Sequence, residues 1–354
     1  MVAAHERLAA IARLLQPILI ESLALRADKI CDELAERWGM VAWDRERLIG
    51  QIQRQLFSLR EQRFGRPGGA AVRILERRQQ PLECLEPVWR YLRKGRRVVL
   101  EWEPGCSVEV VALMQSMASL IGETNLQLAG ALTGAEPKDG HLGPARVGVA
   151  SAPARVALLQ EDGDRELAAY VLVRACLRRT GFDPRCVHRV VVVGSLERLE
   201  RNLRRLWVGA AMGPSDDDLA FAGPVTEAEA ERFLSSERRW RLRPGARVLC
   251  SGGRLEHTSC TRQRPAFLAP ALIRVAEDPE SPSPEPLEGP LLLIHPVADA
   301  DAGTLLLDRL APSGTLRLRI GESPRGLQPQ RGDRQFHGAL LAERLPPGLP
   351  EPRP

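Results

Sequence analysis

The sequence contains no long uncharged hydrophobic run. Its longest apolar stretches, near Val98–Leu100 and Val190–Val193, have the length of a β-strand, whereas a membrane-spanning helix needs about 20 apolar residues. The first part of the chain places charged side chains among apolar ones at helical spacing, unlike the uncharged middle of a signal peptide. We therefore expect a cytoplasmic protein that does not enter a membrane.

Paired cysteines are also missing. The 7 cysteines are scattered without a Cys-x-x-Cys pair, so the chain lacks the usual pattern of a structural zinc site and of a disulfide framework. We expect reduced thiols that are mostly buried. Cys250, His257 and Cys260 form one looser group whose thiolate and imidazole ligands suit zinc. Because a fourth ligand is missing, an ordinary turn after a strand is the interpretation that we favour for this segment.

Lysine is nearly absent, so arginine carries most of the positive charge. Lysine occurs only as Lys29, Lys94 and Lys138, and the net charge of +5 corresponds to an isoelectric point near 9.0. Acidic residues are interleaved with the arginines, and the densest basic run, Arg90–Arg97, leads directly into an apolar strand pattern. We expect this run to be a solvated helix end, where cations are favourable, and we predict no nucleic-acid partner.

What is present is an alternation of helix and strand patterns. The chain has 354 residues, a length that is sufficient for two domains, and 44% of its residues are hydrophobic. Residues 5–62 have the spacing of about three amphipathic helices. Short apolar strands then alternate with helices, which favours a parallel sheet covered on both faces. The predicted strands are 71–75, 98–100, 156–159, 190–193 and 291–294. One helix is predicted to end near Gly95, and two more are predicted to span 108–121 and 166–177.

Two further helices are predicted from their start signals. Ser195 is expected to cap a helix that carries leucines on one face. Thr226 and Glu229 form a capping box, in which each side chain binds a free amide of the helix start. His295, before Pro296, is expected to be the end of a strand.

The most informative feature is a series of short motifs between residues 208 and 275. The motifs are Val208-Gly209, Gly223-Pro224-Val225, the helix signal Thr226–Phe233, Pro244–Gly253 and Phe267–Pro270. Their order and spacing resemble the segment that follows the nucleophilic cysteine in NAD(P)-dependent aldehyde dehydrogenases. Gly289-Pro290 is similar to the end of that family's Glu-x-Phe-Gly-Pro motif. The resemblance implies a shortened and degenerate member of this superfamily.

The resemblance also implies an organisation. The fold class that we expect is α/β and aldehyde-dehydrogenase-like, with a truncated Rossmann-type parallel sheet domain and a second α/β catalytic-like domain. N-terminal helices would occupy residues 1–65, a reduced nucleotide-binding-like domain 66–168, and the catalytic-like domain 169–322. A partly disordered tail would occupy residues 323–354, which end in a proline-rich run.

The chemistry of that family requires residues that this chain does not have. A cysteine thiolate attacks the aldehyde, amide donors hold the oxyanion, and a glutamate activates water. The family's Gly-Gln-x-Cys motif falls on Gly181–Pro184, where only the glycine matches. The nucleophile position is therefore Pro184, which offers neither a thiol nor a backbone N–H. The general-base position falls on Ala150. The side-chain oxyanion donor falls near Gln79, which keeps the amide but adds a methylene group.

The cofactor contacts implied by the resemblance are also altered. A lysine that touches the adenosine ribose falls at or beside Glu101, whose charge would repel a phosphate. A turn that carries a phosphate contact is deleted between Thr133 and Val149. The glutamate that binds the nicotinamide ribose falls on Pro286, although Glu285 is adjacent. We therefore predict no cofactor, and NAD or NADP only if the protein is active.

Two functional hypotheses follow. The first is a catalytically inactive aldehyde-dehydrogenase-like protein with a scaffold role, assembled as a homo-oligomer or with an active aldehyde dehydrogenase. The second is an active enzyme that oxidises an aldehyde with NAD(P) through a displaced nucleophile, Cys186, with Arg185 and His188 nearby to lower the pKa of its thiol. A buried thiol at the start of a strand is the simpler interpretation of Cys186, and we favour the first hypothesis.

Overall fold

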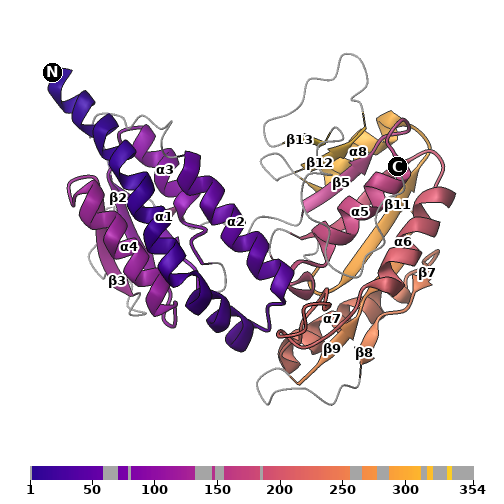
Figure 1. Cartoon of the computed structure of the whole chain (residues 1–354). Coiled ribbons are helices and arrows are strands. Elements are labelled where there is room, and N and C mark those ends of the chain that lie inside the picture. The colour runs from indigo at the N-terminus through magenta and orange to yellow at the C-terminus, as the bar shows by residue number, and fades with distance from the viewer. Residues whose placement is uncertain are drawn as a thin grey trace, which may run out of the picture. The chain divides into compact units, whose positions relative to one another are not determined.

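The computed structural model describes residues 2–58, 71–78, 81–131, 146–147, 155–183, 186–255, 265–276, 287–311, 317–321 and 333–336. The chain divides into two compact units. The first comprises Met1–Trp38 and Arg45–Ala150, and the second comprises Gly39–Asp44 and Ser151–Pro354. Both units combine helices with a parallel sheet (Figure 1), which agrees with the expected α/β class. Within the described residues, no helix is apolar over a length sufficient to cross a membrane.

The first unit contains a parallel sheet with the strand order β3-β2-β1-β4. Helix α3 joins β1 to β2 and helix α4 joins β2 to β3, so the predicted alternation of strand and helix is correct over these elements. The elements are α1 (Val2–Trp38), α2 (Ala42–Ser58), β1 (Val72–Glu76), α3 (Leu85–Arg93), β2 (Val98–Trp102), α4 (Val108–Ile121), β3 (Leu126–Ala131) and β4 (Arg146–Val147).

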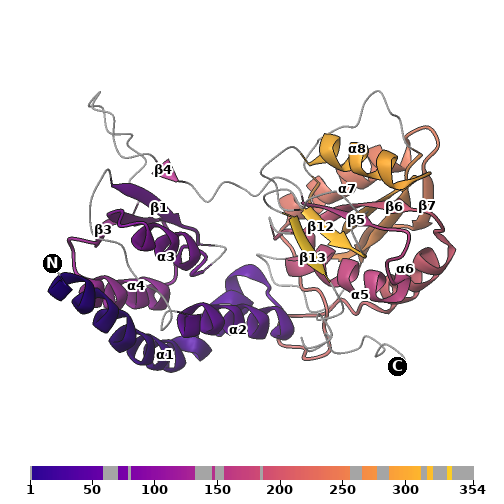
Figure 2. The ribbon, with the colours of Figure 1, turned by 90° about the horizontal axis from the view of Figure 1, so that it is seen from above.

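The prediction of three helices before the first strand is wrong. The first two predicted helices are one helix, α1, which runs through Pro17 and ends before Gly39. Leu15, Leu23 and Leu34 on this helix are all buried, so one apolar stripe continues along it, and α1 packs against α4. Figure 2 shows α1 and α4 side by side.

The second unit contains a larger sheet with the strand order β13-β12-β5-β6-β11-β10-β7. Its strands are parallel except β7, which is antiparallel to β10 and lies at one edge. The elements are β5 (Arg155–Leu159), α5 (Arg165–Cys176), β6 (Val187–Val193), α6 (Glu197–Gly209), α7 (Glu227–Arg241), β7 (Arg247–Cys250), β8 (Gly253–Leu255), β9 (Phe267–Ala269), β10 (Ala271–Arg274), β11 (Leu291–Val297), α8 (Ala300–Leu310), β12 (Arg317–Ile320) and β13 (Asp333–Phe336).

Helices cover both faces of this second sheet. α5 and α6 lie on one face, and α7 and α8 lie on the other, as Figure 2 shows. The side chains of β6 alternate accordingly, since Val190 and Val192 belong to the core under α5 and α6, whereas Val191 and Val193 belong to the core under α8. This burial on both faces explains why the strand is read as a continuous apolar run.

Several boundaries differ from the sequence-based expectations. The division into units falls near residue 150, whereas the boundary expected after Ala168 lies inside α5. Ser195 does not cap α6, because Leu196 occupies the cap position and makes no side-chain cap hydrogen bond. The expected end at His295 is also wrong, since β11 continues to Val297.

The capping box of α7 is confirmed. The Thr226 hydroxyl accepts from the N–H of Glu229, and the Glu229 carboxylate accepts from the N–H of Thr226 at 2.9 Å. In the segment expected to be a partly disordered tail, residues 333–336 form strand β13. The final ten residues, expected to be disordered, lie outside the described part of the chain.

Candidate functional site

The turn between α5 and β6 lies where the resemblance places the nucleophile. Three consecutive residues in this turn have positive φ: Arg179 at 47°, Thr180 at 55° and Gly181 at 81°. For a residue with a side chain, this left-handed conformation costs roughly 1–2 kcal/mol. Two such residues in succession require surrounding contacts that hold the turn in place.

Those contacts come from segments distant in the sequence. The backbone N–H of Arg179 donates to the carboxylate of Asp44 at 2.8 Å, and the Thr180 hydroxyl donates to the carbonyl oxygen of Gly223 at 2.9 Å. Asp44 and Thr180 are both buried. The motif glycine Gly223 therefore serves to hold the strained turn.

Two other motif glycines meet at the same turn. The N–H of Gly289 donates to the carbonyl oxygen of Gly181 at 3.0 Å. A Cβ atom on Gly181 would lie 2.1 Å from the Gly289 carbonyl, and one on Gly223 would lie 1.9 Å from the carbonyl oxygen of Gly39. Only glycine permits these approaches. The motif glycines of the resemblance thus have a structural reason to be present that does not depend on catalysis.

Cys186 lies directly before β6, in the environment of a structural thiol. Its side chain is 1% exposed, and the thiol donates to the carbonyl oxygen of Arg178 at 3.4 Å. Burial, with a smaller contribution from the Asp183 carboxylate, raises the pKa of Cys186 to about 12 despite the opposing charge of Arg178. A thiol of this kind is protonated at neutral pH and is a poor nucleophile.

The ring of His188 faces Leu291 and Cys176. Its Nδ1 lies 3.0 Å from the carbonyl oxygen of Leu291 and 3.8 Å from the sulfur of Cys176. Burial lowers the pKa of His188 to about 4, although hydrogen bonds to the backbone of Leu291 and Gly181 oppose this shift. The imidazole is therefore neutral at pH 7 and offers no positive charge to a thiolate.

Glu101 is paired within the first sheet. Its carboxylate lies 2.7 Å from a guanidinium nitrogen of Arg73, and the residue is 6% exposed. The two residues come from the adjacent strands β2 and β1. The expectation that Glu101 presents a repulsive negative charge needs correction, because Arg73 neutralises it. Neither side chain is free to replace a lysine that touches a ribose.

Glu76 is a buried carboxyl that was not singled out in the sequence. It ends β1, is 0% exposed, and accepts hydrogen bonds from the backbone N–H groups of Leu82 and of Cys84, the latter at 3.2 Å. Burial raises the pKa of Glu76 to about 7, even though these hydrogen bonds lower it. Glu76 thereby holds the turn that follows β1, near which Gln79 was expected to act.

Several expected site residues lie outside the described part of the chain. They are Gln79, Ala150, Pro184, Arg185, His257, Cys260, Glu285 and Pro286. Cys250 ends β7 and is half-buried. Among the residues that the structure describes, no group of His, Cys, Asp and Glu side chains has an arrangement that could hold a metal ion.

Solved structures that match this architecture include several aldehyde dehydrogenases. An NAD-dependent aldehyde dehydrogenase from Sinorhizobium meliloti matches with a TM-score of 0.69 at 16% identity, over 89% of this chain and 70% of that one. This chain has the aldehyde dehydrogenase fold. An NAD-dependent benzaldehyde dehydrogenase from Corynebacterium glutamicum matches with a TM-score of 0.65 at 15% identity, over 90% and 77% of the two chains.

The lactaldehyde dehydrogenase of Escherichia coli has a TM-score of 0.64 at 15% identity, with coverage of 90% and 74%. No protein-family model and no curated protein sequence matches the chain. At this level of identity, the aldehyde dehydrogenase fold is shared while the residues that occupy it have diverged. The expected fold is confirmed, and function depends on the individual positions.

Proposed function

We propose that this protein is a catalytically inactive member of the aldehyde dehydrogenase fold, with a scaffold role. The observation that carries the proposal is the state of the turn at Gly181. The contacts that shape the turn are present, whereas the nearest cysteine, Cys186, is buried and hydrogen-bonded, with its pKa raised to about 12. Aldehyde oxidation by the mechanism of the family that the chain resembles needs an accessible thiolate.

The resemblance also identifies the residues that stand at the catalytic positions of the family. Pro184 stands at the nucleophile position and Ala150 at the general-base position. Proline lacks both a nucleophile and an N–H, and alanine cannot accept a proton. The described environment of Glu101 supports the same conclusion for the cofactor, because its carboxylate is engaged with Arg73 at 2.7 Å. We therefore propose that neither NAD nor NADP binds.

Cofactor titration on the full chain tests this proposal. A ligand that binds the native state raises its apparent stability by RT ln(1 + [L]/Kd), which is about 2.7 kcal/mol at a concentration of 100 Kd. We expect no saturable rise in Tm with NAD or NADP. An active aldehyde dehydrogenase measured in parallel serves as the positive control. A saturable rise for this chain would contradict the proposal.

The second candidate is an active NAD(P)-dependent aldehyde dehydrogenase that uses Cys186. The position of Cys186 at the end of the strained turn favours it, since strain is often stored at functional sites. The decisive comparison is aldehyde-dependent NAD(P)H formation by the unaltered protein and by Cys186→Ser. If the unaltered protein is active and the variant is not, Cys186 is the nucleophile and the scaffold proposal is wrong.

The assembly of this scaffold is proposed to involve a second copy of the chain or an active aldehyde dehydrogenase. The resemblance, rather than a described contact, motivates this part. Sedimentation velocity of the protein alone, and of a mixture with an active aldehyde dehydrogenase, distinguishes the two partners. If this protein sediments as a monomer in both experiments, the assembly role is excluded, and the proposed inactivity is not affected.

A further inference from the structure

Two apolar cores lie on the α7/α8 face of the second sheet, and polar side chains lie between them. One core surrounds α7 and includes Leu293, and the other surrounds α8 and includes Val191. Arg189 on β6 pairs with Leu293 on β11, and Val191 pairs with His295. Because side chains alternate along a strand, Arg189 and His295 share this face at diagonal positions. Both residues are buried.

Helix α7 places further polar groups against these strands. Ser236, Glu237 and Trp240 are all buried on the face of the helix that packs on the sheet. The guanidinium carbon of Arg189 lies 5.4 Å from the centre of the Trp240 ring, and that of Arg243 lies 3.7 Å from it. The contact between Arg189 and Trp240 thus joins α7 to β6.

Several polar atoms of this cluster are buried without a hydrogen-bond partner among the described residues. They include the hydroxyl oxygen of Ser236, the indole nitrogen of Trp240 and Nε2 of His295, together with Oε1 of Glu237, which has its ion pair with Arg241 at 3.8 Å. Each of these side chains is more than nine-tenths buried. Buried polar groups in folded proteins are normally hydrogen-bonded. The indole N–H can only donate, and the hydroxyl can also donate, so these atoms suit a ligand that accepts hydrogen bonds.

Two positively charged side chains, Arg189 and Arg243, act on His295. Burial, and then the charges of Arg189 and Arg243, lower the pKa of His295 to about 3. The imidazole is therefore neutral at pH 7. The one buried carboxylate on this part of α7, Glu237, lies 3.8 Å from the guanidinium group of Arg241. A negative charge placed beside His295 would be attracted by two guanidinium groups.

We propose that the cluster formed by Arg189, Ser236, Trp240, Arg243 and His295 is a binding site for a small monocarboxylate. A carboxylate offers two acceptor oxygens and pairs well with a guanidinium fork. A phosphate dianion would lose more hydration free energy on burial. Arg243 is half-buried, so the cluster reaches the surface at this side chain. This inference does not depend on the proposed catalytic inactivity.

Titration of the full chain with acetate and propionate tests the proposal, with inorganic phosphate at matched ionic strength for comparison. Tryptophan fluorescence and Tm are the two readouts, because Trp240 lies within the cluster. We expect a saturable response to the carboxylates and none to phosphate. No saturable response to either carboxylate would overturn the proposal, and an equal response to phosphate would overturn the carboxylate assignment.

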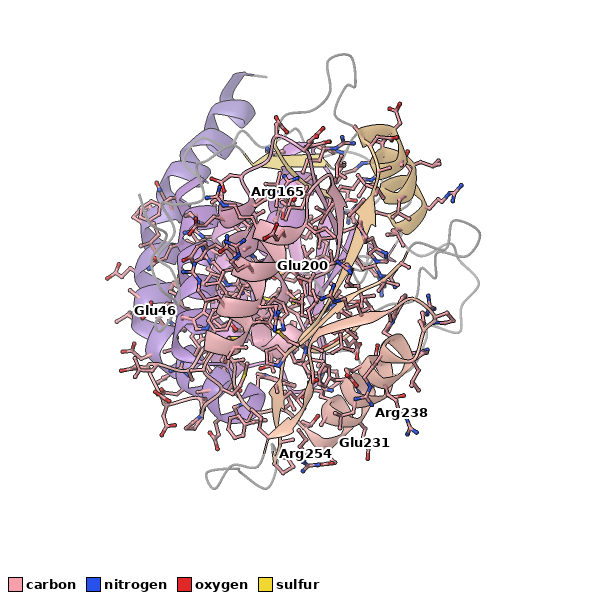
Figure 3. The ribbon with its side chains drawn as sticks, turned by 90° about the vertical axis from the view of Figure 1, so that its right-hand side faces the viewer. Glu46, Arg165, Glu200, Glu231, Arg238 and Arg254 are labelled. Atoms are coloured by element: carbon pink, nitrogen blue, oxygen red, sulfur yellow. The ribbon has the colours of Figure 1, made fainter. Side chains whose placement is uncertain are left out.

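Substitutions on α7 and directly after it test whether the carboxylate binds at this cluster. Arg243→Gln is expected to weaken carboxylate binding at least tenfold, and Ser236→Ala to weaken it several-fold with little change in Tm without ligand. Arg238 is exposed on the outer side of α7 (Figure 3), so Arg238→Gln is the matched control and is expected to bind as the unaltered protein does. If Arg238→Gln and Arg243→Gln weaken binding equally, the response is a general charge effect and the site does not exist.

Discussion

Gly289 donates a backbone hydrogen bond of 3.0 Å to Gly181, and a Cβ atom on Gly181 would lie only 2.1 Å from the Gly289 carbonyl. The two glycines belong to motifs far apart in the sequence, and their contact closes the turn before β6. Because this contact requires the absence of side chains, it constrains both positions even where no reaction takes place. Packing therefore explains why these glycines are present in a chain that has Pro184 at the nucleophile position.

Gly181→Ala is expected to lower the free energy of unfolding by about 3 kcal/mol, since an alanine there combines a positive φ with a backbone clash. The φ at this position is 81°. Urea denaturation followed by circular dichroism measures the loss. Gly209→Ala is the matched control, because a Cβ on Gly209 has nothing within 4 Å. A similar stability for both variants would contradict the packing explanation.

The thiols are expected to differ in their reaction with an alkylating reagent. Cys186 is 1% exposed, and its pKa of about 12 leaves about one thiolate in 10⁵ molecules at pH 7. Cys250 is half-buried and should therefore react before Cys186. Mass spectrometry after timed exposure of the native protein to iodoacetamide gives the order. Rapid modification of Cys186 before Cys250 would favour the displaced-nucleophile hypothesis instead.

Features of the fold that depend on neighbouring residues were predictable from the sequence. The capping box of Thr226 and Glu229 and the helix over 108–121 involve residues within a few turns of each other. The division of α1 into two predicted helices was wrong, since α1 is continuous and tolerates Pro17 in its interior. The order of the motif glycines predicted the fold because such glycines mark close backbone approaches.

The candidate site was less predictable because its contacts are made between distant segments. The short separation of Cys186 and His188 in the sequence left an assisted thiol open as the alternative hypothesis, whereas in the structure Nδ1 of His188 lies 3.0 Å from the carbonyl oxygen of Leu291. The pairing of Glu101 with Arg73 depends on the register of β1 and β2. Glu76 could have been noticed as an acidic residue at the end of an apolar strand, but its burial is a tertiary property.

Arg165 connects the carboxyl ends of β5 and β6 by hydrogen bonds, and its replacement should destabilise the second unit. Its guanidinium group donates to the carbonyl oxygens of Gln160 at 2.6 Å, Gly163 at 2.8 Å and Val193 at 2.7 Å; Figure 3 labels this residue on α5. Arg165→Met is expected to cost about 2–3 kcal/mol in unfolding free energy, because partners are left unpaired. Arg201→Met, which removes an exposed pair with Glu197, should cost under about 1 kcal/mol. Equal losses in urea denaturation would exclude this connecting role.

The stability of the first unit should depend on pH through Glu76. Its pKa rises from 4.5 to about 7 on folding, so between these values the folded state binds the proton and the unfolded state does not. Stability is therefore full below pH 4.5 and declines as the pH rises towards 7, by an amount on the order of 2–3 kcal/mol. The lowered pKa values of His188 and His295, about 4 and about 3, act in the opposite direction, since neutral histidines stabilise the second unit as the pH rises to 6.5.

Glu76→Gln separates these effects because glutamine keeps the shape of the protonated carboxyl and does not titrate. The difference in unfolding free energy between the variant and the unaltered protein is expected to grow in favour of the variant from pH 4.5 to 7, because only the unaltered protein must bury a charge there. Urea denaturation at four pH values across this range measures that difference. Glu103→Gln, which removes a nearby carboxylate that accepts from the Arg78 N–H in an exposed contact, is the control variant measured in parallel. A difference for Glu76→Gln that does not change with pH would mean that Glu76 ionises in the folded protein as readily as in the unfolded chain.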